Sequence, residues 1–247
     1  MSDAVAPAVE APLTESGPGL LSRAVGVLFT PRRTYAAVAA RPRVFGALAL
    51  AIVVIAGGTG LFVSSQVGRD TVLEMQTRQA EAFGRPMTEA QLQNLERVAP
   101  YFAAFTAVSQ IVVIPIMALV VSGLMYALFT AILGGDGTYK QTLAVVAHAG
   151  FVLVAAQFFI LPLDYIRESL TSPTSLAVFL PFLEETSFLA RFLGAIDLVY
   201  LWWFTSLAIG LGVLYKRRTG PIALGLLALY GVIALLIAMV RTALSGA

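Results

Sequence analysis

Five long apolar stretches constrain this chain more than any other feature of its sequence. They cover residues 44–68, 101–134, 142–163, 192–215 and 221–244. A helix rises 1.5 Å per residue, so about 20 apolar residues cross the roughly 30 Å hydrocarbon core of a bilayer, and each stretch reaches that length. The alternation of apolar and polar residues that a membrane barrel requires is missing. The sequence therefore predicts an all-α polytopic membrane protein with five transmembrane helices.

The overall composition excludes a water-soluble domain. Hydrophobic residues make up 58% of the chain and charged residues 12%, and the mean hydropathy is +0.85. The net charge is +2 and the charges gather at the ends of the apolar stretches, so we expect no nucleic-acid partner. Residues 1–19 carry prolines and the acids Asp3, Glu10 and Glu15 but no apolar core, which predicts a disordered tail rather than a signal peptide.

Residues 20–43 are predicted to form two amphipathic helices at the cytoplasmic face, before the first apolar stretch. The first, residues 20–29, has an apolar face with Arg23 on the opposite side. Thr30 is expected to cap the second, which opens at Pro31 and runs to residue 40. Both helices are expected to lie in the lipid headgroup layer. The side chains expected to contact lipid headgroups there are Arg32, Arg33, Arg41 and Arg43.

The distribution of basic residues predicts the orientation of the chain. With the N-terminus inside, the inner segments hold nine bases and four acids, and the outer segments hold seven bases and nine acids. The short loop Lys216-Arg217-Arg218 and the arginines before the first stretch then share the cytoplasmic side, as positively charged loops prefer. Arginine supplies fourteen of the sixteen bases, a usage typical of GC-rich bacteria. We therefore expect a bacterial inner-membrane protein with a cytoplasmic N-terminus and an outer C-terminus.

Two outer connections are too long to be simple turns. The insert at residues 69–100 contains Thr88-Glu89-Ala90-Gln91, a capping-box pattern that predicts a helix ending near Ala99, and hence an extracytoplasmic helical hairpin. The second connection, residues 164–191, contains the apolar segment 175–183. That segment is too short to span, so we expect it to be re-entrant or interfacial. Residues 44–247 thus form one predicted transmembrane domain with two outer inserts.

A few polar residues within the spans form the candidate intramembrane site. Counting depth at 1.5 Å per residue places Asp197 roughly 8 Å below the outer boundary and His148 about 10 Å from the inner one. Intramembrane ionisable residues are functional candidates by default. The alternatives are a site for a lipid headgroup, ion or small solute, and an interhelical hydrogen-bond network. The candidate residues are Asp197, Gln157, Gln110, Ser109, Thr59 and His148.

Three sequence patterns carry a family resemblance. They are FTPRRTY at residues 29–35 with Arg41-Pro42, LGGDGTYKQT at residues 133–142, and AIDLVYLW at residues 195–202 with AIG at 208–210. Over residues 20–245 the chain resembles the Yip (Ypt-interacting protein) domain family. The resemblance implies a five-span, non-enzymatic membrane protein, and eukaryotic members are tied to Rab-type GTPases and vesicle traffic. Where the family usually shows an aromatic after the aspartate, this chain has Leu198, and the nearest aromatic is Tyr200.

Enzyme signatures are missing from the sequence. A single histidine cannot supply an H-E-x-x-H zinc site, and Gly57-Gly58-Thr59-Gly60 lacks the Lys-Ser/Thr of a phosphate loop, so we expect no enzyme, cofactor or metal. The predicted function is to organise or dock partners at the membrane. The alternative is a transport component, or a protein that binds a small solute or lipid through the polar layer around Asp197. Expected partners are membrane lipids, a protein in the membrane or at its surface, and a second copy in a homodimer.

Overall fold

The computed structural model describes residues 18–82, 84–184 and 187–244, so nearly all of the expected tail lies outside the described residues. The described chain consists of helices, their connections and one isolated antiparallel bridge between Ser175 and Asp197. Four helical stretches within the described ranges are long and apolar enough to cross a membrane. They are Phe45–Ser64, Glu89–Ile132, Tyr139–Arg167 and Thr219–Leu244. The expected all-α, polytopic membrane class is confirmed.

The remaining expected span, residues 192–215, is interrupted. Three residues, 195–197, separate helix α9 (Phe188–Gly194) from helix α10 (Leu198–Leu214). The 17 residues of α10 reach about 25 Å, which is the lower limit for a transmembrane helix. Asp197 therefore lies at the N-cap of α10 rather than inside a longer helix.

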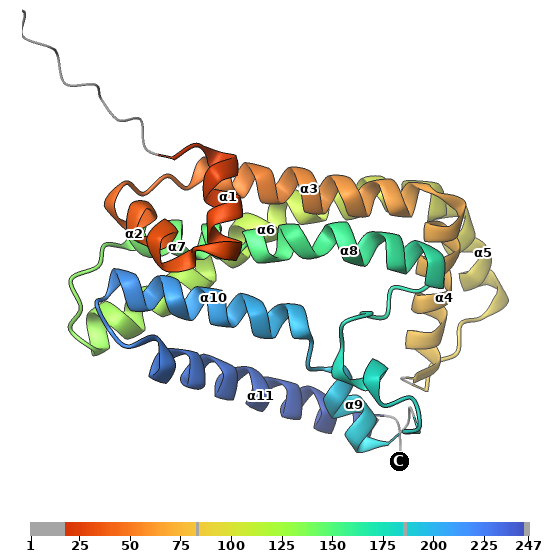
Figure 1. Ribbon diagram of the computed structural model, residues 1–247. Helices are drawn as coiled ribbons and strands as arrows, with labels where there is room; N and C mark the ends of the chain where they lie inside the picture. Colours follow the sequence, from red (N-terminus) through yellow and green to blue (C-terminus); the bar gives the residue numbers. More distant parts are fainter. Residues whose placement is uncertain (1–17, 83, 185–186, 245–247) are drawn as a thin grey trace, which may run out of the picture.

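The helices run roughly along one another in an elongated bundle (Figure 1). Helix α3 (Phe45–Ser64) packs against α6 (Phe102–Tyr126) and α8 (Phe151–Arg167), and α7 (Tyr139–Ala149) joins α6 to α10. Helix α11 (Thr219–Leu244) packs mainly on α10 and α9. The outer faces of α6 and α11 expose large apolar side chains. Such faces suit contact with lipid tails, which are as apolar as the side chains themselves.

The two N-terminal helices begin and end where predicted, at Leu20–Phe29 (α1) and Pro31–Ala40 (α2). The expected cap is wrong, because the Thr30 hydroxyl donates to the Gly26 carbonyl of α1 and makes no capping bond to α2. Helix α2 is docked on α10, with Tyr35 and Val38 fully buried. The N-terminal helices are thus part of the packed bundle.

The insert between α3 and α6 forms the expected pair of helices, α4 (Gln66–Ala82) and α5 (Glu89–Val98). Both bonds of the Thr88–Gln91 capping box are present, and the 3-10 turn η1 (Ala99–Tyr101) leads into α6. A side chain at Gly68 would place its Cβ 2.0 Å from the Phe62 carbonyl oxygen, so the turn from α3 into α4 requires glycine. In Figure 1, α4 and α5 lie at the end of the bundle opposite α2.

At the end of the bundle near α2, α6 continues as a π-helical turn, η2 (Ala127–Ile132), before the chain reverses (Figure 1). The reversal uses Gly134, which has a positive φ of 66° that glycine adopts readily. The loop after α8 contains the short 3-10 turn η3 (Leu176–Phe179).

Candidate functional site

Asp197 is bound by polar groups of its own chain. Its Oδ1 accepts the Val199 N–H at 2.7 Å, which caps α10, and both carboxylate oxygens lie 2.9 Å from Thr174 Oγ1. The Ser172 hydroxyl donates to Oδ2, and the residue is only 8% exposed. A carboxylate at a helix N-terminus also meets the positive end of the helix dipole. These groups stabilise the charge, and no cationic side chain of the described residues pairs with it.

The segment between α9 and α10, residues 195–197, is also hydrogen-bonded to α11. The Tyr230 hydroxyl accepts the Asp197 N–H at 2.9 Å and donates to the Ala195 carbonyl at 3.1 Å. Leu198 N–H donates to the Thr174 carbonyl at 3.0 Å, which completes the bridge between the loop and the start of α10. These partners are not among the residues expected from the sequence, although the hydroxyl-rich run Ser172-Pro173-Thr174-Ser175 is a signal for them.

The other residues expected at the depth of Asp197 lie on α3, α6 and α8, and none of them hydrogen-bonds the Asp197 carboxylate. Ser109 Oγ donates to the Thr106 carbonyl of its own helix at 2.8 Å. Gln157 Oε1 on α8 is shielded from solvent and has no hydrogen-bond partner among the described residues. Thr59 on α3 and Gln110 on α6 are half-buried. Hydroxyls of the preceding loop take the place of the expected partners.

His148 forms a separate buried contact at the end of α7. Its Nδ1 lies 2.7 Å from the Ala144 carbonyl, which assigns the proton to Nδ1 and leaves Nε2 as an acceptor. Arg23 Nη1 donates to that Nε2 at 3.1 Å, so the pair links α1 to α7. Arg23, expected opposite an apolar face of this helix, is therefore on the buried side of α1. The exposed side of α1 is apolar instead, with Leu21 and Phe29 more than 70% exposed.

Tyr35 joins α2 to the middle of α10. Its hydroxyl lies 2.7 Å from Ser206 Oγ, and burial raises the pKa of Tyr35, so the phenol stays neutral. The ring packs on Gly210, where a Cβ would lie 3.0 Å from the Tyr35 ring and 2.5 Å from Val145 Cγ1. Glycine at 210 therefore permits the close approach of α2 to α10.

Tyr215 links the turn between η2 and α7 to the C-terminal end of α10. Its hydroxyl lies 2.8 Å from Thr142 Oγ1 and 3.2 Å from Thr130 Oγ1. A Cβ at Gly135 or Gly137 would come within 2.6 Å of the Tyr215 ring, so both glycines allow the turn to close over the ring. The pattern at residues 133–142 thus packs around one aromatic side chain.

Helix α10 is held at its start, middle and end by these contacts, which we name the three α10 anchors. Each of the three sequence patterns that carry the family resemblance contributes to one of them. The polar groups of these anchors hydrogen-bond one another, so the anchors are suited to holding the helices together. The anchors are Asp197 with Ser172 and Thr174, Ser206 with Tyr35, and Tyr215 with Thr142 and Thr130.

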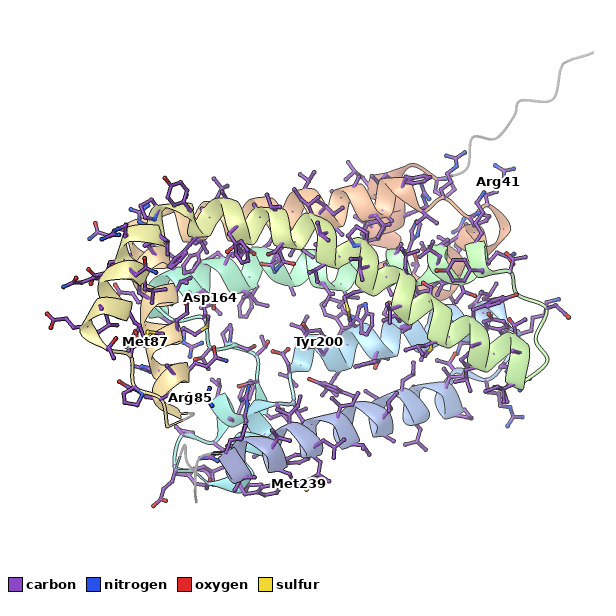
Figure 2. The ribbon with its side chains drawn as sticks, turned by 180° about the vertical axis from the view of Figure 1, so that it is seen from behind. Arg41, Arg85, Met87, Asp164, Tyr200 and Met239 are labelled. Atoms are coloured by element: carbon purple, nitrogen blue, oxygen red, sulfur yellow. The ribbon has the colours of Figure 1, made fainter. Side chains whose placement is uncertain are left out.

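The expected headgroup-contacting arginines are exposed and lie around α2 and the start of α3. They are Arg32, Arg33, Arg41 and Arg43. Figure 2 shows Arg41 at this end of the bundle, opposite Met87 and Arg85 of the hairpin. The exposed Lys216, Arg217 and Arg218 follow α10 at the same end, where Arg217 donates to the Leu133 carbonyl at 2.7 Å.

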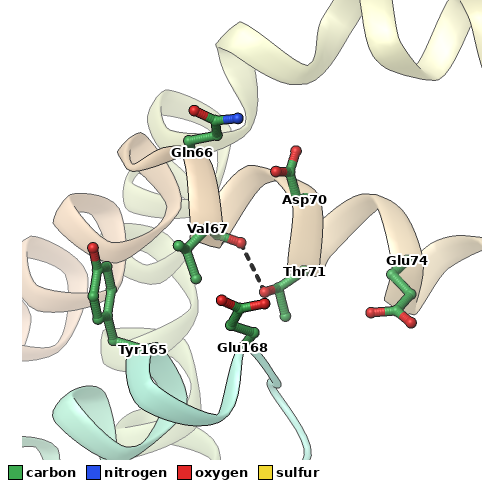
Figure 3. Close-up of a pocket in the computed structure, with 7 residues that line it drawn as sticks. All are labelled: Gln66, Val67, Asp70, Thr71, Glu74, Tyr165 and Glu168. Atoms are coloured by element: carbon green, nitrogen blue, oxygen red, sulfur yellow. Dashed lines mark hydrogen bonds between the residues drawn. The ribbon is translucent and has the colours of Figure 1, made fainter.

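A pocket of about 660 Å³ lies at the other end, between α4 and the end of α8 (Figure 3). Three of its lining residues, Asp70, Glu74 and Glu168, carry carboxylates, and the Thr71 hydroxyl donates to the Val67 carbonyl at 2.7 Å. Within the part of the chain that the structure describes, no three His, Asp or Glu side chains gather as metal ligands would.

The long apolar helices and the internally paired polar groups define an integral membrane protein of the polytopic, all-helical class. The chain belongs to the Yip1 domain family, whose match covers residues 25–241, nearly the whole sequence. The expected family is thereby confirmed. A comparison with curated proteins found no match, and a comparison with solved structures found none either.

Proposed function

We propose that this protein is a non-enzymatic membrane organiser that docks a partner protein through its outer hairpin. Membership of the Yip1 domain family supports a role at a membrane. Helix α5 of the hairpin carries the proposal, because none of its residues is buried. It contacts mainly η1 and is stabilised by its own capping box.

The composition of α5 indicates how a partner would bind. Leu92, Leu95 and Val98 recur every three residues, so they lie along one side of the helix. The opposite positions are polar or charged. An amphipathic helix normally buries its apolar side, and such a side can dock into a groove of a partner. We therefore assign the apolar side of α5 as the docking surface.

Polar substitution of the apolar side of α5 tests this function. The variant Leu92→Ser with Leu95→Ser is compared with Gln93→Ser with Asn94→Ser, which changes two exposed polar residues of the same helix. Each full-length protein is purified from native membranes after cross-linking, and the bound proteins are quantified by mass spectrometry. We expect a partner to be lost about tenfold from the first variant and retained by the second, a change of about 1.4 kcal/mol.

Equal recovery of every cross-linked protein from the two variants contradicts the proposed docking surface. A loss from both variants has the same consequence, because the contact would then not depend on the apolar side. Circular dichroism and thermal melting confirm that each variant keeps its helices, since α5 lacks buried residues and its substitution leaves the core unchanged.

The proposed orientation has five spans, with α10 as the fourth, a cytoplasmic N-terminus and an outer C-terminus in a bacterial inner membrane. The exposed bases around α2 and after α10 support a cytoplasmic position for that end of the bundle. Under this orientation, α1 and α2 lie at the cytoplasmic surface and α4 and α5 outside.

The alternative function, transport or solute binding around Asp197, has less support. The Asp197 carboxylate accepts hydrogen bonds from Ser172 and Thr174 of the loop after α8 and from Val199 of α10, and these bonds favour a cohesive role for it. A Cβ at Gly60 of α3 would lie 3.4 Å from the Cβ of Ala107 on α6. This close approach supports packing of α3 on α6 within one chain, and a homodimer would use another face.

A further inference from the structure

Arg23 is a buried cation without a carboxylate partner. The residue is 8% exposed, and no carboxylate of the described residues pairs with it. Its guanidinium donates from Nη1 to the neutral ring of His148, and its Nε is shielded from solvent with no partner among the described residues. Buried charges in proteins are ordinarily paired with an opposite charge. The positive charge of Arg23 is therefore unmatched within the described chain.

Arg43 brings a second positive charge to the same place. It lies one residue before the N-cap of α3 and is exposed. A Cβ at Gly46, three residues after Arg43, would lie 3.5 Å from Leu20, three residues before Arg23, so the two segments that carry the arginines lie side by side. Burial lowers the pKa of Arg23, and repulsion from the like charge of Arg43 lowers it further. An anion between them would turn this repulsion into attraction.

Two helix N-termini meet beside these arginines. A Cβ at Gly46, in the first turn of α3, would lie 3.5 Å from Leu20 Cδ1, and Leu20 is the first residue of α1. Neither helix has a side-chain cap or an acid in its first turn. Uncapped helix N-termini present free N–H groups and a partial positive charge, which favour phosphate and other anions.

We propose that Arg23, Arg43 and the N-termini of α1 and α3 bind the phosphate group of an anionic phospholipid at the inner membrane surface. Exposed apolar side chains next to these N-termini favour a lipid over free phosphate, because they offer contact to an acyl chain. Leu21 of α1 is 72% exposed and Phe45 at the start of α3 is 89% exposed. The site goes beyond general attraction of a basic surface, since it uses a buried arginine.

Lipid titration of the purified full-length protein tests the site. Dioleoyl phosphatidylglycerol and zwitterionic dioleoyl phosphatidylcholine are added in detergent, and bound lipid is counted by native mass spectrometry. We expect one phosphatidylglycerol to bind at least tenfold more tightly than phosphatidylcholine. Arg43→Gln should weaken phosphatidylglycerol binding about tenfold, as expected for loss of one charge-assisted hydrogen bond.

Arg218→Gln is the matched control, because Arg218 is an exposed base at the same end of the bundle. This variant removes the same charge and should bind phosphatidylglycerol within twofold of the unaltered protein. Equal weakening by Arg43→Gln and Arg218→Gln would indicate diffuse attraction and overturn the site. Arg23→Gln should weaken binding further, but Arg43→Gln decides the test because an exposed substitution leaves α1 packed.

Inorganic phosphate distinguishes the two sources of the ligand. If the site holds a lipid, millimolar inorganic phosphate should leave bound phosphatidylglycerol in place, because inorganic phosphate has no acyl chains to contact the apolar side chains. Displacement of the lipid by phosphate at equal concentration would overturn the assignment to a phospholipid.

Discussion

Asp197 illustrates how far a single residue can be interpreted from sequence. Its identity as the one acid within the apolar stretches singles it out. Its partners were not predictable from depth, because depth counting assumes a straight helix through residues 192–215. The chain instead breaks at residues 195–197, which moves Asp197 to an N-cap and brings Ser172 and Thr174 to it from a loop more than 20 residues away.

Removal of the Asp197 carboxylate should destabilise the protein in proportion to the acceptors lost. Asp197→Ala leaves the Ser172 and Thr174 hydroxyls and the first turn of α10 without their acceptor, and should lower the free energy of unfolding by about 2–3 kcal/mol. Asp197→Asn keeps one oxygen for Val199 and Thr174 and should cost about 1 kcal/mol. Denaturant unfolding in detergent measures both values.

Glu96→Ala, at an exposed position of α5, is the control for loss of a carboxylate and should change the unfolding free energy by less than about 0.5 kcal/mol. If Asp197→Ala is as mild as this control, the hydrogen bonds around Asp197 do not stabilise the fold and the cohesive role is wrong.

Among the elements, the bounds of the two N-terminal helices were predictable to the residue, and the ends of α3 and α10 were not. Pro31 is a local start signal for α2, Arg41-Pro42 is its stop signal, and Thr88–Gln91 is a local cap of α5. The ends of α3 and α10 depend on contacts that apolarity alone does not encode. One is the close approach of Gly68 to the Phe62 carbonyl, and the other is the bridge between Ser175 and Asp197.

The contact between α2 and α10 should depend on Gly210. Its alanine variant places a Cβ 2.5 Å from Val145 Cγ1 and 3.0 Å from the Tyr35 ring, so Gly210→Ala should lower the free energy of unfolding by about 1–3 kcal/mol. The same substitution should cost less in a Val145→Ala background, where the clashing methyl is absent. Denaturant unfolding of the unaltered protein, the two single variants and the double variant measures the difference.

Gly225→Ala on α11 provides the matched control. Nothing lies within 4 Å of a Cβ at Gly225, so alanine should be neutral or stabilising by up to about 1 kcal/mol through its helix propensity. A Gly210→Ala variant as stable as Gly225→Ala would mean that α2 and α10 separate without cost.

For the whole molecule, the proposed orientation predicts that the two ends of the bundle face solvent on opposite sides of the membrane. The chain has no cysteine, so single cysteines can be labelled without background. Glu89→Cys on α5 should react with a membrane-impermeant maleimide in intact cells, because α5 is expected outside. Asp136→Cys in the inner turn should react only after the membrane is opened. Both positions are exposed, so burial would not prevent the reaction.

Labelling of both cysteines from the same side of the membrane would contradict the proposed orientation. Labelling of Asp136→Cys alone in intact cells would reverse it. Either result would move the proposed docking surface and phospholipid site to other compartments.

The order of the three α10 anchors along the chain has a consequence for biogenesis. The partner residues Tyr35, Thr130, Thr142, Ser172 and Thr174 all precede α10, and Tyr215 directly follows its last residue. During translation, the ribosome therefore delivers this short helix after these five polar partners have been synthesised. Insertion of α10 can then be driven by a prepared protein surface as well as by lipid.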